Sequence, residues 1–124
     1  MKAFISRYIS NHSETSEKHK DSALVTHYYK AKHDDTFRAV EELFQSPSEI
    51  VASSKERGEL TVKYKGKRRA FIVATIIMVR PFHTAVDFSI TTDSGGLVDF
   101  GYSRNLIVQL YEKLDSQFTT VDPS

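Results

Sequence analysis

Polar and apolar residues alternate in one stretch of the chain and give way to an almost unbroken apolar run in the next. Residues 59–65 alternate with a period of two, which is the pattern of a half-buried β-strand. Residues 70–92 are mostly apolar and β-branched, with an interruption around Pro81. Because proline and β-branched residues disfavour a buried helix, we expect strands at 69–80 and 84–92 that form the long hairpin of an antiparallel sheet.

Two other segments have the spacing of amphipathic helices. Apolar residues within 37–44 share one helical face after the N-cap candidates at 34–36, and Pro47 ends this helix. Apolar residues also recur at helical spacing over 106–118. This second pattern predicts a core-facing helix with Ser103 as its N-cap.

The remaining apolar segments complete the sheet. We expect a first strand at 23–31, a hairpin of 49–55 with 59–65, and a short strand at 97–100 as an optional addition. The predicted order is strand, helix, four or five antiparallel strands, helix, which is an α+β fold with both helices on one face of the sheet. This order resembles that of the TATA-binding-protein-like fold or of a reduced helix-grip domain. Such a resemblance in fold implies no function.

Charge and apolar content divide the chain into three parts. Residues 1–22 are expected to form a flexible N-terminal segment, because 10–22 contain no apolar residue. Within it, residues 2–10 have the spacing of a short amphipathic helix that needs a partner surface. A single α+β domain is predicted over 23–119, followed by a tail at 120–124.

Length and composition exclude several classes of protein. With 124 residues and no cysteine, the chain is expected to be one domain without disulfides or thiolate metal sites. The longest apolar run, residues 70–79, is about half the length of a membrane span. We therefore expect a soluble, cytoplasmic protein with no membrane partner. The net charge of +1 gives no overall attraction to polyanions, so any electrostatic argument has to be local.

The sequence predicts no catalytic, metal or cofactor site. The five histidines include no pair at the helical spacing that directs two rings at one metal ion, and phosphate-binding or nucleophile motifs are missing. The remaining catalytic alternative requires Asp87, Asp93 and Asp99 to converge in a cleft. The protein is therefore expected not to be an enzyme.

A basic cluster lies in a part of the sequence that contains no acidic residue between Leu60 and Val86. Its members are the candidate polyanion patch: Lys63, Lys65, Lys67, Arg68 and Arg69. Such a patch can bind nucleic acid through phosphates, with Tyr64 as a stacking platform for a base. The alternative is that these charges only deter edge-to-edge aggregation of the sheet.

Both rows of side chains on the long strand 69–80 are apolar. A sheet with helices on one side should be polar on the other, so we expect the second face to be covered as well. The predicted cover is a second copy of the chain or a protein partner, and the N-terminal segment or an apolar ligand are alternatives. A further alternative is that neighbouring side chains of a small, strongly curved sheet screen this strand without any cover. Ile72, Ile76 and Met78 are the candidate interface, although the sequence does not decide which row faces the helices.

A joint of special residue types precedes the last helix. Gly101 permits a positive φ, Ser103 is the predicted cap, and Arg104 is expected to pair with Asp99. An alternative makes Tyr102 and Arg104 ligand contacts.

The leading functional prediction is a non-enzymatic cytoplasmic domain that acts by self-association or by binding a protein partner through its sheet. The alternative is a binding module for a small apolar ligand or for a polyanion such as nucleic acid. Neither prediction requires a cofactor.

Overall fold

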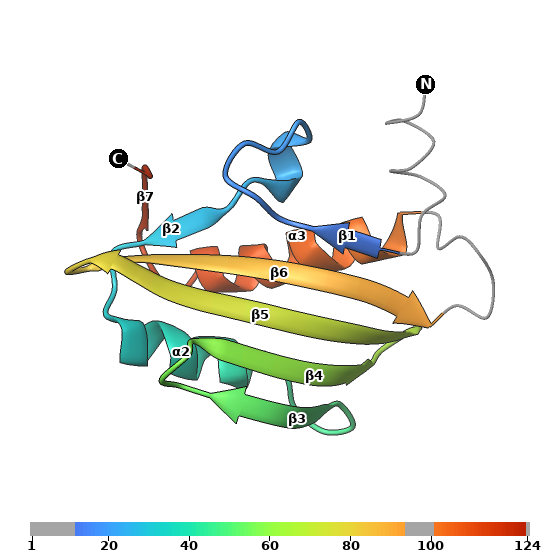
Figure 1. The fold of residues 1–124 in the computed structure, drawn as a ribbon. Coiled ribbons are helices and arrows are strands. Elements are labelled where there is room, and N and C mark those ends of the chain that lie inside the picture. The colour runs from blue at the N-terminus through green and yellow to red at the C-terminus, as the bar shows by residue number, and fades with distance from the viewer. Residues whose placement is uncertain (1–11, 94–100, 124) are drawn as a thin grey trace.

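A seven-stranded antiparallel sheet and two α-helices form the α+β domain that the computed structural model describes over residues 12–93 and 101–123 (Figure 1). The order of strands across the sheet is β3-β4-β5-β6-β2-β7, and β1 pairs with the other end of β6. The strands are β1 (His12–Glu14), β2 (His27–Tyr29), β3 (Glu49–Ser54), β4 (Glu59–Lys65), β5 (Arg69–Arg80), β6 (His83–Asp93) and β7 (Thr120–Val121).

The helices pack on the long central strands. Helix α2 (His33–Glu42) packs against β5, and α3 (Tyr102–Asp115) packs against β6 and β1. A short 3-10 helix, η1 (Ser22–Leu24), precedes β2. None of the helices in the described ranges is long and apolar enough to cross a membrane.

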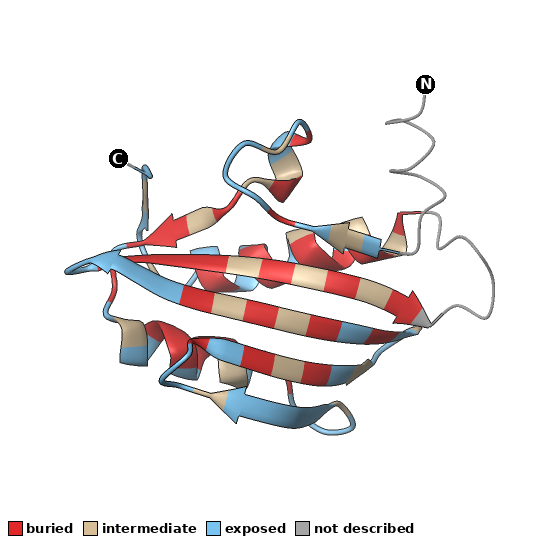
Figure 2. Ribbon diagram, in the orientation of Figure 1, coloured by how far each residue is buried: buried red, intermediate tan, exposed pale blue. Residues whose placement is uncertain are grey.

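The register of the central strands sets the two faces of the sheet. Ile72 on β5 lies between Val62 on β4 and Ile90 on β6, and all three side chains are completely buried. The even-numbered residues of these strands form one core with the helices, whereas the odd-numbered residues point to the opposite side. The alternation of buried and less buried residues is visible along β4, β5 and β6 (Figure 2).

Two of the three residues of the candidate interface predicted from the sequence, Ile72 and Ile76, lie on the helix-covered face and cannot form an interface there. Ile72 and Ile76 are 0% and 1% exposed beneath the helices, while Met78 is 43% exposed beyond the end of the buried row. Ala70 and Ala74 explain this choice of face, because their small side chains leave room for the large side chains of the helices. The uncovered row of β5 is the odd-numbered one.

The polar segment expected as a flexible linker belongs in part to the fold. Residues 12–14 form β1, with His12 opposite Thr91. Thr15 and Asp21 are buried, although this stretch contains no apolar side chain. The strand predicted at 23–31 is correspondingly shorter and spans only His27–Tyr29.

The chain order also differs from the prediction at its end. Strand β7, in the predicted tail, pairs with β2, so α3 is followed by another strand and the sheet has more strands than expected. The predicted helix at 2–10 and strand at 97–100 lie outside the described residues.

The joint before α3 confirms one prediction and corrects another. Gly101 has φ 81° and is the N-cap of α3, as expected for a residue that tolerates the left-handed region. Ser103 is not the cap: it lies within the first turn, 1% exposed, with its hydroxyl 2.8 Å from that of Ser13. Arg104 pairs with Asp21, while its expected partner Asp99 lies outside the described residues.

Candidate functional site

The side of β5 that faces away from the helices carries an apolar row. We call this set the open row: Phe71, Val73, Thr75, Ile77 and Val79. Phe71, Ile77 and Val79 are 47%, 51% and 51% exposed, and Val73 and Thr75 are half-buried. For a central strand of a sheet these are large exposed fractions, so this face has no complete cover among the described residues.

Small side chains flank much of the open row. Val73 lies between Thr61 on β4 and Ser89 on β6, and Ala85 stands opposite Ile77. Since none of these neighbours is long or charged, another flat surface can approach the row closely.

Charges flank the row near Thr75, where Glu59 and Asp87 are its register neighbours. Asp87 Oδ1 accepts hydrogen bonds from the hydroxyls of Thr15 and Thr26, both at 2.6 Å. These bonds connect Thr15, which follows β1, and Thr26, which precedes β2, to the same carboxylate on β6. Asp87 thus has a structural role.

The catalytic alternative that needed three converging aspartates gains no support from these contacts. The side chain of Asp93 and the whole of Asp99 lie outside what the structure describes. Among the described residues, no group of three or more histidine or acidic side chains is arranged to hold a metal ion.

A hollow of about 510 Å³ lies at the other end of the same face. We call it the basic hollow, and its lining residues are Lys63, Tyr64, Lys65, Arg69, Ala70, Phe71, Thr91 and Thr92. Three of these residues are cationic, and none of the described lining residues is acidic. Lys65 Nζ forms an ion pair with Glu49 at 3.2 Å.

The structure divides the polyanion patch predicted from the sequence. It brings Lys63, Lys65 and Arg69 together in the basic hollow and leaves Lys67 exposed in the turn between β4 and β5. Arg68 points elsewhere, because its guanidinium lies 5.7 Å from the centre of the Tyr102 ring. Its backbone N–H donates to the Tyr102 hydroxyl at 3.3 Å, which fastens this turn to α3.

Tyr64, the stacking platform predicted from the sequence, is not the exposed aromatic ring of this hollow. Tyr64 packs edge-on against Phe44, with ring centres 6.5 Å apart, and burial raises the pKa of its hydroxyl. Phe71 is the exposed ring. Its odd number was the available signal, because it shares a face with Lys63 and Arg69 while Tyr64 points to the helices.

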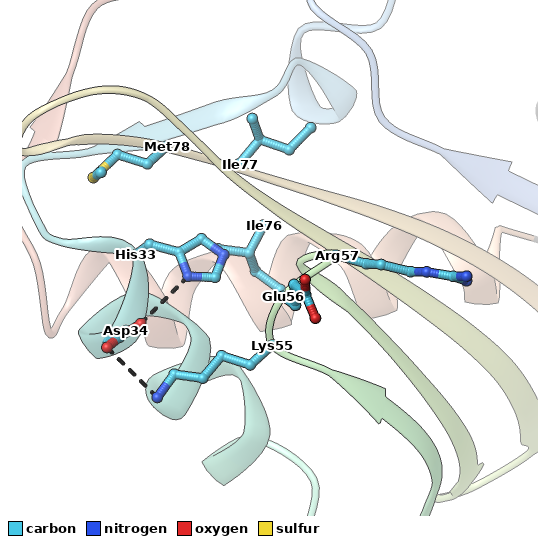
Figure 3. Close-up of a pocket in the computed structure, with 8 residues that line it drawn as sticks. All are labelled: His33, Asp34, Lys55, Glu56, Arg57, Ile76, Ile77 and Met78. Atoms are coloured by element: carbon cyan, nitrogen blue, oxygen red, sulfur yellow. Dashed lines mark ion pairs between the residues drawn. The ribbon is translucent and has the colours of Figure 1, made fainter.

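A second hollow, of about 760 Å³, lies beside the start of α2 (Figure 3). There, Asp34 Oδ1 lies 3.6 Å from His33 Nδ1, and Asp34 Oδ2 lies 3.5 Å from Lys55 Nζ. The side chain of Arg57 extends away from His33 (Figure 3). Because the carboxylate of Asp34 is paired with His33 and Lys55, this hollow presents no concentrated charge to a ligand.

Three ring-bearing residues and one carboxylate join β2 to α3. Asp115 Oδ1 accepts from the Tyr29 hydroxyl at 2.7 Å and lies 3.0 Å from His27 Nδ1. The His27 ring stacks on Tyr111 with centres 3.7 Å apart. Burial raises the pKa of both tyrosines, and neighbouring Asp115 adds to this effect. This arrangement holds β2 and α3 together. Sequence spacing could not reveal it, because His27 and Asp115 are 88 positions apart.

The edge of the open face near β2 contains Tyr28 and His83. The Tyr28 hydroxyl donates to Glu17, and burial together with this bond raises its pKa to about 12. His83 is 8% exposed and packs against the Tyr28 ring, with centres 5.3 Å apart. Its Nε2 is buried and has no hydrogen-bond partner among the described residues.

Comparisons of the chain with models of protein families, with curated proteins and with solved structures find no match. The function of the chain therefore has to be inferred from the surface of its α+β domain. On the part of that surface formed by residues 12–93 and 101–123, the open row and the basic hollow are the features with a distinct binding chemistry.

Proposed function

We propose that this protein is a non-enzymatic binding domain that self-associates through the open face of its sheet, with a second copy of the chain as the cover. The observation that carries the proposal is the exposure of Phe71, Ile77 and Val79 on a central strand. Large apolar side chains exposed together on one face of a sheet are a feature of interaction sites on soluble proteins.

Burial of the open row supplies the driving force. Fully burying a side chain such as Ile77 contributes roughly 1.5–3 kcal/mol, and about half of this remains available because the side chain is about half exposed. Two sheets pack face to face at a separation of about 10 Å, which the small flanking residues Thr61, Ser89 and Ala85 permit. A two-fold axis parallel to β5 and midway between two facing sheets places the open row of one copy on the same row of the other, as an isologous contact requires.

The face is a better candidate for this contact than the edge of the sheet. The pairing of edge strand β3 with β4 shifts between Ile50 and Ala52, and such a bulge hinders pairing with a further strand.

Two finer predictions accompany this proposal. The α+β class is shared with the predicted TATA-binding-protein-like or reduced helix-grip arrangement, but strands β1 and β7 add to the predicted order, and no function follows from that arrangement. A cytoplasmic location stays a prediction from composition. A different protein or an apolar ligand on the open row are the alternatives to a second copy.

Sedimentation velocity over a range of protein concentrations tests the proposal. We expect a reversible dimer, and Ile77→Asp should remain monomeric while keeping the wild-type thermal unfolding curve. Phe82→Asp is the matched control, because Phe82 is 53% exposed but lies in the turn between β5 and β6. A wild-type protein that stays monomeric at the highest concentration would overturn the proposal.

A further inference from the structure

The basic hollow combines positive charge with an exposed aromatic ring. Phe71 stands directly between Lys63 on β4 and Thr91 on β6, and Arg69 lies two residues away on the same side of β5. Opposite side chains on neighbouring strands have Cβ atoms about 4.5–5.5 Å apart, so the ring and the Lys63 side chain are immediate neighbours.

Two cations of the hollow, Lys63 and Arg69, are the ones that a ligand would contact. Neither Lys63 nor Arg69 forms an ion pair with the side chains that the structure describes, whereas Lys65 is partly neutralised by Glu49. Asp93 is the register neighbour of Arg69 on β6, so Lys63 and Arg69 need to be tested separately as well as together. The Thr91 hydroxyl lies 2.6 Å from His12 Nδ1, which places an imidazole at the rim.

We propose that the basic hollow binds a nucleobase together with its phosphate, either as a free nucleotide or within a single-stranded nucleic acid. The Phe71 ring stacks on the base, and Lys63 and Arg69 contact the phosphate. The volume of about 510 Å³ is within the range of small-ligand sites. An apolar ligand would bring no counter-charge to these cations, and an inorganic anion would make no use of the ring.

This site goes beyond the proposed self-association but shares Phe71 with it. Ligand binding and association therefore compete for the ring, and binding should be measured at protein concentrations where the monomer predominates. The Ile77→Asp variant separates the two proposals, because it removes association and leaves the lining of the basic hollow intact.

The test is fluorescence anisotropy of a labelled oligothymidylate of about twelve nucleotides, with unlabelled strand, AMP and inorganic phosphate as competitors. Two phosphate contacts predict an affinity that falls about sevenfold between about 50 and 200 mM salt. Phe71→Ala should weaken binding by about 5- to 150-fold, the range for loss of one stacked base. Phe82→Ala, the control, should leave it unchanged.

The charge variants test the phosphate contacts. The combination Lys63→Gln with Arg69→Gln should reduce the slope of log affinity against log salt by about 1.4, and each single change by about half of that. The combination Arg38→Gln with Lys113→Gln alters the net charge equally on the helices and should leave the slope unchanged.

The competitors distinguish the source of the nucleotide. Displacement by AMP indicates a site for free nucleotides, and displacement by the unlabelled strand alone indicates a single-stranded polymer. The proposal is overturned if neither AMP nor the strand binds at low salt, if phosphate competes as well as AMP, or if Phe71→Ala binds like the wild type.

Discussion

Arg104 on α3 holds Asp21 with two hydrogen bonds, 2.6 Å from Nε to Oδ2 and 3.1 Å from Nη2 to Oδ1. Asp21 is buried, and its Oδ1 also accepts from the backbone N–H of Ala23 at 3.0 Å. The pair joins residues 83 positions apart and fastens the polar segment before β2 to the last helix.

Arg104→Ala should lower the free energy of unfolding by about 1.5–3 kcal/mol, because a buried carboxylate loses its charged donors. Arg104→Lys should give an intermediate loss, since lysine keeps the charge but not the two-pronged geometry. Urea denaturation measures both, with Arg38→Ala on the exposed side of α2 as the control. Equal stability of Arg104→Ala and Arg38→Ala would show that the pair contributes nothing.

Substitutions of the adjacent buried residues His83 and Thr84 should have different effects on the stability of the fold. His83→Leu should leave stability unchanged or raise it, because it removes a buried nitrogen without a partner among the described residues. Thr84→Val should cost about 1 kcal/mol, because the Thr84 hydroxyl donates to the Ala31 carbonyl at 2.7 Å. Thermal unfolding compares the two variants. A larger loss for His83→Leu would mean that the imidazole has a stabilising contact.

Two glycines with positive φ should differ in their tolerance of alanine. A Cβ at Gly58, where φ is 70°, would lie 2.0 Å from the Ile76 carbonyl oxygen, whereas one at Gly101 meets no atom within 4 Å. Gly101→Ala should therefore show only the backbone cost of about 1–2 kcal/mol, and Gly58→Ala should cost more. Gly101→Asn should recover part of the loss. Chemical denaturation that ranks the two alanine variants in reverse would contradict this.

Stability should decrease in alkaline solution. Burial and the bond to Glu17 raise the pKa of Tyr28 from 10.0 to about 12, and burial raises the pKa values of Tyr29 and Tyr111 as well. The folded state therefore retains these protons where the unfolded state has lost them, so the stabilisation is complete below pH 10 and falls as pH rises toward 12. Denaturation curves at several pH values check this. Stability that stays constant or rises over that interval would contradict it.

The sequence predicted the strands with strong patterns but not their orientation. Residues 59–65 and 69–80 form β4 and β5 with the expected bounds, because alternation and β-branching act locally. A period of two is unchanged when the two faces are exchanged, so the pattern could not choose between Ile72 and Phe71 as the open position. The alanines at 70 and 74 were the one local signal.

The polar segment before β2 could not be predicted because its order depends on distant partners. Thr15 donates to Asp87, 72 positions away, and Asp21 accepts from Arg104, 83 positions away. Only part of the basic hollow was predicted, because the list of basic residues does not show to which face of the sheet each side chain points. Adjacent basic residues are easily seen in a sequence, but the alternation of the strand sends Arg69 to one face and Arg68 toward Tyr102.

The rate of thiol labelling at position 77 tests the central claim most directly. The chain contains no cysteine, so Ile77→Cys and, as control, Phe82→Cys each introduce a single reactive thiol. We predict that labelling at 77 slows as protein concentration rises through the association range, in proportion to the dimer fraction, while labelling at 82 keeps one rate. Equal rates at position 77 in dilute and concentrated protein would contradict self-association through the open row.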